Sequence, residues 1–121
     1  MYNILEKRAD VNRSRETGSE SMPLFMGVDI GTSSAKAAII DGRGDVLALG
    51  KSEYDLICAH SGWSEQHPET WWDGCRIAVQ SALKALGRPA REIRAVGISN
   101  QMHSLVVLDS DGNCVRPSIL H

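Results

Sequence analysis

Three short, mostly apolar runs joined by tight turns restrict the possible folds of this chain more than any other feature. They extend over Leu24–Ile30, over Ala35–Ile40, and from Val46 to about Tyr54. Residues 31–34 and 41–45 separate them, and both segments combine glycine with small or polar residues, which is typical of turns. Parallel strands need a crossover of about a dozen residues. The runs therefore predict three strands of an antiparallel meander.

A helix is expected after a loop at residues 55–67. Pro68 suits the first helical turn, where its missing N–H costs nothing, and Glu69 favours the positive end of the helix dipole. Gly87 and Pro89 mark the end of the helix. Apolar residues recur at a spacing of three or four and form one face: Trp72, Cys75, Val79, Ala82, Leu83 and Leu86.

Two further strands are expected after the helix. Ile93–Ser99 is predicted as the fourth strand and Ser104–Leu108 as the fifth. Residues 109–113 are predicted as a hairpin turn, followed by a last extended piece at residues 114–119. A meander followed by a helical crossover produces a mixed sheet with a helix on one face, so the expected fold class is α/β.

Length, charge and cysteine usage exclude several classes of protein. A chain of 121 residues suits one domain, and a net charge of −2 argues against a general nucleic-acid-binding protein. No apolar run reaches the roughly 18 residues of a membrane span. Cys58, Cys75 and Cys114 form no CxxC pair and are expected to be free, buried or half-buried thiols in a reducing cytoplasm. The histidine spacing predicts no structural metal site.

The first 23 residues differ in character from the rest of the chain. The charges of four acidic and four basic side chains cancel there, and the segment lacks the continuous apolar stretch of a secretory signal. It is expected to be a disordered leader or extension. The ordered domain is expected to occupy residues 24–121.

The segment Asp29-Ile30-Gly31-Thr32-Ser33-Ser34 connects the first two predicted strands. A phosphate requires backbone N–H donors that no side chain obstructs, which Gly31 permits, and the three hydroxyl residues add further donors. Asp29 is suited to hold a hydrated Mg²⁺. An ordinary hairpin turn is the alternative, and Lys36 points either to a phosphate or to solvent.

Two further segments combine polar residues with an aromatic or a soft apolar side chain. Trp63 and Glu65, in Gly62-Trp63-Ser64-Glu65-Gln66, are suited to line a sugar site. In the alternative, the Trp63 ring packs back on the domain, and Glu65 and Gln66 accept hydrogen bonds from backbone donors near the helix start. Gln101, Met102 and His103 follow a predicted strand, where binding residues are common. A purely structural role is the alternative there too.

Taken together and in this order, these segments resemble the start of FGGY-type carbohydrate kinases, most closely the xylulokinases. The resemblance covers about residues 24–121. Its matching motifs are Gly27 to Lys36, Gly62 to Gln66, Pro68-Glu69 with Trp71-Trp72, Gly97-Ile98 with Gln101-Met102-His103, and Leu108-Asp109 followed by Arg116 to Leu120.

The resemblance implies an actin-like ATPase (ribonuclease H-like) fold and a function in phosphoryl transfer. It implies a kinase that moves the γ-phosphate of ATP to D-xylulose, giving D-xylulose 5-phosphate, with Mg²⁺ as cofactor. The ATP phosphates and Mg²⁺ are then expected near Asp29, Gly31, Thr32, Ser33, Ser34 and Lys36. The sugar is expected near Gln101, Met102 and His103, with Trp63 and Glu65.

Departures from the family pattern leave other assignments open. Asn100 precedes Gln101 and Ser104 follows His103, in places where glycine is usual, and gluconokinase-like members can carry Met-His-Ser. His67 stands where an Asp helix cap is common. The general-base Asp and the adenine-binding half belong to later parts of such kinases, so this chain alone is expected to be inactive. A non-catalytic sugar- or nucleotide-binding module and a gene fragment are the rival hypotheses.

Overall fold

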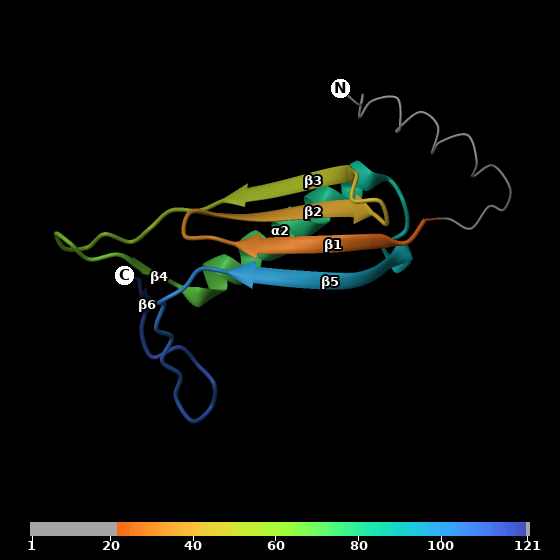
Figure 1. Cartoon of the computed structure of the whole chain (residues 1–121). Coiled ribbons are helices and arrows are strands. Elements are labelled where there is room, and N and C mark those ends of the chain that lie inside the picture. The colour runs from red at the N-terminus through yellow and green to blue at the C-terminus, as the bar shows by residue number, and fades with distance from the viewer. Residues whose placement is uncertain (1–21, 121) are drawn as a thin grey trace, which may run out of the picture.

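The computed structural model describes residues 22–120, which form a four-stranded sheet, one long helix and a small two-stranded sheet (Figure 1). The elements follow in the order β1 (Leu24–Ile30), β2 (Ser34–Asp41), β3 (Val46–Glu53), β4 (Glu65–Gln66), α2 (Pro68–Leu86), a short 3-10 turn (Ala90–Glu92), β5 (Ile93–Asn100) and β6 (Ser118–Ile119). The predicted leader lies outside the described residues, except for positions 22 and 23. Within the described part of the chain, no helix meets the length and hydrophobicity needed to cross a membrane.

The large sheet has the order β3-β2-β1-β5. β1 is antiparallel to β2 and β2 to β3, whereas β5 is parallel to β1. The expected meander and mixed sheet are therefore confirmed. Because β1 and β5 run in the same direction, their carboxyl ends lie side by side at one edge, and the β4–β6 pair lies beyond that edge (Figure 1).

Helix α2 covers one face of the sheet and encloses the core. Alternate residues of β1 and β2 point toward it, as the period of two requires, and Ala78 and Ala82 of the helix are fully buried against them. Gly50 of β3 is packed so closely that a Cβ there would lie 2.0 Å from the carbonyl oxygen of Ala78. The helix ends at Gly87 in the left-handed conformation, with φ of 64°.

Several expectations about individual elements are wrong. Ser104–Leu108 is not a strand, because its residues form only isolated β-bridges, between Leu105 and Ile119 and between Leu108 and Cys114. Residues 55–67 are not entirely loop, since β4 lies within them. Trp72 is 70% exposed and does not belong to the buried helix face. Cys58 is exposed, although all three thiols are free as expected.

Candidate functional site

The turn between β1 and β2 is closed by its own backbone. The Gly31 N–H donates to the carbonyl oxygen of Ser34 at 2.9 Å, which folds residues 31–34 tightly. Thr32 and Ser33 are exposed, and Gly31 and Ser34 are half-buried. Asp29 stands at the end of β1 on the face away from α2 and is exposed. The carboxylate and the hydroxyls therefore reach solvent at the same edge of the sheet.

The segment after β5 lies directly beside this turn. The Gln101 N–H donates to the carbonyl oxygen of Ile30 at 2.9 Å, which extends the pairing of β5 with β1 by one residue. The Thr32 hydroxyl donates to Gln101 Oε1, also at 2.9 Å. Two segments separated by some 70 residues of sequence are thereby joined through both backbone and side chains, as parallel pairing of β1 and β5 dictates.

Gln101 and His103 each have an unusual feature. The Gln101 Nε2 atom is buried and has no hydrogen-bond partner among residues 22–120. A buried donor of this kind costs free energy unless an acceptor reaches it. His103 adopts a positive φ of 59°, a conformation uncommon for residues other than glycine and frequently found at functional sites. Met102 between them is 70% exposed.

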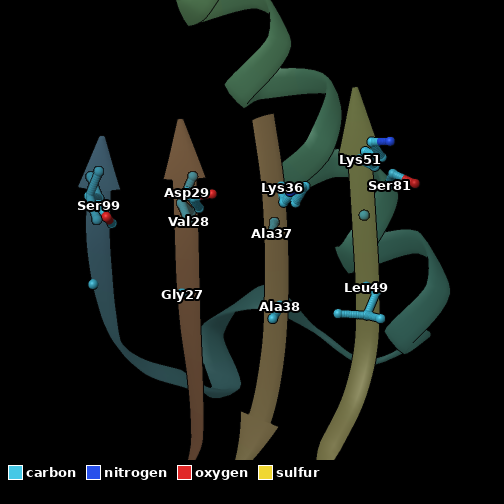
Figure 2. Close-up of a pocket in the computed structure, with 13 residues that line it drawn as sticks. Gly27, Val28, Asp29, Lys36, Ala37, Ala38, Leu49, Lys51, Ser81 and Ser99 are labelled. Carbon is cyan, nitrogen blue, oxygen red and sulfur yellow. The ribbon is translucent and has the colours of Figure 1, made fainter. Parts of the chain in front are cut away.

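A row of polar side chains crosses the open face of the sheet near the same edge. Lys36 is the direct cross-strand neighbour of Asp29, and Lys51 is that of Lys36. Figure 2 shows Ser99, Asp29, Lys36 and Lys51 side by side, one from each strand, above Gly27, Ala38 and Leu49. Lys51 also forms an ion pair with Glu53 at 2.5 Å. The row borders a shallow hollow of about 970 Å³ whose floor is small and apolar.

Tyr54 holds the turn between β1 and β2 through two hydrogen bonds, a role that no sequence motif indicated. Its hydroxyl donates to the Gly31 carbonyl oxygen at 2.7 Å, and its N–H donates to the Ser33 carbonyl oxygen at 3.0 Å. Burial raises the pKa of the Tyr54 hydroxyl, and the negative charge of Asp29 and the Cys75 thiol raise it further. Only the proximity of Tyr54 to Gly31 in space reveals this contact.

Trp63 and Glu65 are placed by the small sheet. Trp63 is half-exposed and makes an edge-to-face contact with His60, at a centroid distance of 4.9 Å. Half of its surface is therefore covered, and the other half is open to solvent. Glu65 is buried and ion-paired with Arg116. Both residues line a second pocket, of about 430 Å³, together with Arg116 and Ile119.

Gln66 has a structural role that differs from the predicted alternative. Its Nε2 donates to the Asp55 carbonyl oxygen at 2.7 Å, and its Oε1 accepts a hydrogen bond from the Trp71 indole. Gln66 thus ties the loop to the first turn of α2 without satisfying the backbone donors at the helix start. The connection from β4 to the segment after His103 runs through β6, because the Leu105 N–H donates to the Ile119 carbonyl oxygen.

The donor groups at the turn fit a magnesium ion that keeps most of its waters better than an ion ligated entirely by protein side chains. Across residues 22–120, no three His, Cys, Asp or Glu side chains are grouped as metal ligands. Mg²⁺ commonly keeps several waters and binds through one or two carboxylates together with substrate phosphates. The exposed Asp29, beside the three hydroxyl residues of the turn, supplies such a single carboxylate.

Comparisons with known proteins show the family to which this chain is similar. Residues 24–121 match the N-terminal domain of the FGGY family of carbohydrate kinases. The chain is 37% identical over 99 residues to the xylulose kinase of Klebsiella pneumoniae, an alignment that covers 80% of this chain and 20% of the relative. This chain thus spans about a fifth of the length of that relative.

Solved structures give the same result. The chain superposes on a xylulose kinase from Brucella ovis with a TM-score of 0.76 at 36% identity, covering 80% of this chain and 20% of that one. For a gluconate kinase from Lactobacillus acidophilus, the TM-score is 0.73 at 29% identity, and the superposition covers 82% of this chain and 20% of that one. The expected fold class, the actin-like ATPase fold in its N-terminal portion, is confirmed.

Proposed function

Because the chain belongs to the FGGY family of carbohydrate kinases, we propose that it is the N-terminal part of a sugar kinase for D-xylulose. In that reaction the γ-phosphoryl group of ATP moves to a sugar hydroxyl and gives D-xylulose 5-phosphate. The observation that supports the proposal most is the junction of the two loops, where the Thr32 hydroxyl bonds to Gln101 at 2.9 Å. A kinase needs its phosphate and sugar sites adjacent, since positioning supplies much of the catalysis.

On the phosphate side, we assign Asp29, Gly31, Thr32, Ser33, Ser34 and Lys36 to Mg-ATP. Gly31 lets the backbone approach the phosphates, and Lys36 offsets part of the negative charge. The Ser33 and Ser34 hydroxyls donate to phosphate oxygens, whereas the Thr32 hydroxyl is engaged with Gln101. Asp29 would hold Mg²⁺ through its waters. When bound, the ion would neutralise charge on the transferring phosphoryl group.

On the sugar side, we assign Gln101, Met102 and His103, with Trp63 and Glu65 nearer the β4–β6 pair. The unpartnered Nε2 of Gln101 supports this assignment, because a sugar hydroxyl would satisfy a buried donor. The positive φ of His103 supports it as well, since strained backbone is commonly kept where it serves a function. The general base that takes the proton of the sugar hydroxyl is proposed to come from a later part of a longer kinase.

We propose the rest of such a kinase as the partner of this chain, with ATP and a sugar as its small-molecule ligands and the cytoplasm as its location. The apolar floor of the open sheet face supports this partnership, because it exposes Leu49 together with the small residues Gly27 and Gly97. Three free thiols suit a reducing compartment. Nucleic acid and membrane are not proposed as partners.

A chimera tests the proposed function directly. Residues 24–121 would replace the matching fifth of the Klebsiella pneumoniae xylulose kinase, and the purified chimera would be assayed with xylulose and, separately, with gluconate. We expect ATP-dependent phosphorylation of xylulose by the chimera and none by the 121-residue chain alone. The matched control is the same chimera carrying Met102→Ala and His103→Ala, which should lose activity.

Other outcomes would favour other functions. A folded chimera that phosphorylates gluconate and not xylulose would support gluconate kinase, the alternative favoured by Ser104 and by the Lactobacillus acidophilus structure. A folded but inactive chimera would contradict the kinase proposal. In that case, saturable heat on titrating xylulose or Mg-ATP into the 121-residue chain would support a non-catalytic binding module.

A further inference from the structure

We propose that Tyr54 is a positioning residue for phosphate binding, acting through the backbone of the Gly31–Ser34 turn. This inference rests on the proposed function. Tyr54 follows the last residue of β3, so it reaches the turn from a neighbouring strand. It makes two hydrogen bonds to the turn, one from its hydroxyl and one from its N–H, at 2.7 and 3.0 Å.

The two bonds act on the groups that would oppose an anion. Backbone carbonyl oxygens carry partial negative charge, so a phosphate-binding turn must direct them away from the ligand and present N–H groups to it. Tyr54 engages the carbonyl oxygens of Gly31 and Ser33. Those of Ile30 and Ser34 accept from the N–H groups of Gln101 and Gly31. Four carbonyl oxygens around the turn are thus held by internal donors, two of them by Tyr54.

The ring of Tyr54 is itself held by helix α2. Gly74 is buried at the point where the helix faces the ring, and a Cβ at that position would lie 2.5 Å from Tyr54 Cε1 and 2.7 Å from Cδ1. These distances are too short for any real contact, so only glycine leaves room for the ring. The helix therefore fixes the ring, and the ring fixes the turn, although Gly74 is remote from the turn in sequence.

Tyr54→Phe in the chimera described above separates positioning from a general loss of structure. The substitution keeps the ring and removes only the hydroxyl. We expect the KM for Mg-ATP to rise roughly three- to tenfold, the effect of one lost hydrogen bond, with the KM for xylulose unchanged. A purely structural role would lower the active fraction, and so kcat, and leave both KM values unmoved.

Two matched variants and a second measurement complete the test. Gly74→Ala favours the helix itself but displaces the ring, so it should also raise the KM for Mg-ATP. Ser110→Ala removes an exposed hydroxyl in the 109–113 turn and should change nothing. In the 121-residue chain, amide hydrogen exchange at Gly31, whose N–H donates to the Ser34 carbonyl oxygen, should be faster in Tyr54→Phe than in Ser110→Ala.

The outcomes distinguish this inference from the proposed function. A wild-type chimera without activity contradicts the function, whatever Tyr54 does. An active chimera in which Tyr54→Phe leaves the KM for Mg-ATP unchanged overturns the positioning role. Unchanged hydrogen exchange at the Gly31 amide in Tyr54→Phe overturns it independently of any activity.

Discussion

At the scale of single residues, one tyrosine connects a strand end, a helix and a turn. Tyr54 is half-buried, its hydroxyl donates to the Gly31 carbonyl oxygen, and the negative charge of Asp29 acts on it. Burial and the Asp29 charge both disfavour the phenolate, so the pKa of Tyr54 in the folded chain is raised above its ordinary value of 10.0. The neutral hydroxyl is the form that can donate to Gly31.

The raised pKa has a defined consequence for stability. A group whose pKa is higher in the folded than in the unfolded chain stabilises the fold fully below its unfolded pKa, and this contribution is lost as pH rises through the folded pKa. We expect Tyr54→Phe to lower the unfolding free energy by about 1 kcal/mol near neutral pH, through the lost hydrogen bond. Above pH 10.0 the difference between the two proteins should shrink.

Urea unfolding at a series of pH values, from about 7 to about 11, measures this difference directly. Comparison with Tyr54→Phe removes the titration of lysines, which both proteins share. A gap between the two proteins that stays constant across the whole range would show that the Tyr54 proton is not linked to folding.

At the scale of elements, the close approach of α2 to the sheet decides which residues the strands can carry. β3 brings Gly50 against the helix backbone at Ala78 and Ala82, where a Cβ would lie 2.0 Å from an oxygen and 2.6 Å from a nitrogen. Backbone atoms inside a helix cannot turn aside as a flexible side chain can. The short distance between β3 and α2 therefore depends on the absence of a Cβ atom at Gly50.

Gly50→Ala should accordingly destabilise the chain by about 3 kcal/mol, the upper range for overpacking a well-packed core. Gly27→Ala is the matched control, because nothing lies within 4 Å of a Cβ built there. It should change the unfolding free energy by less than about 0.5 kcal/mol. Equal urea midpoints for the two variants would show that α2 can move away from β3 at little cost.

The elements could be predicted from sequence where local signals agree, and not where a distant partner decides. Short turns identified β1 to β3, and Pro68 and Gly87 marked the helix limits. Residues 104–108 have the pattern of a strand, but the two-residue strand β6 meets them only at Leu105, so they form only isolated bridges.

The same reasoning holds for the candidate site. The turn after β1 and the segment after β5 carry recognisable motifs, and the parallel pairing of the two strands brings them together. Tyr54 carries no motif of its own, and Arg116, although it begins the Arg116–Leu120 match, was not predicted as a site residue. Each acquires its role from a contact with a residue distant in sequence, with Gly31 and with Glu65 respectively.

At the scale of the whole molecule, the sheet is covered on one side and incompletely. α2 packs against β3 and β2 and reaches β1 only slightly. Val96 and Ile98 of β5 are the cross-strand neighbours of the buried Met26 and Val28, yet they are 56% and 71% exposed. We interpret these two side chains as part of a surface that a further element of a longer kinase would cover.

Replacing both by threonine tests this interpretation. In the 121-residue chain, Val96→Thr with Ile98→Thr should change the unfolding free energy by less than about 0.5 kcal/mol, and it should reduce binding of a hydrophobic dye. In the chimera the same pair should cost about 2 kcal/mol or more, because the positions become buried there. Val28→Thr, at a position already buried, should destabilise both proteins. Equal costs of the double variant in both contexts would contradict the interpretation.

The parallel pairing of β1 with β5 also sets the order in which the site is assembled during synthesis. The meander and α2 are built from neighbouring stretches of chain, so their contacts can form while later residues are still being added. The β1–β5 pairing must wait until residues 93–100 have left the ribosome. A nascent chain therefore presents the Gly31–Ser34 turn, already held by Tyr54, before Gln101 arrives to join it.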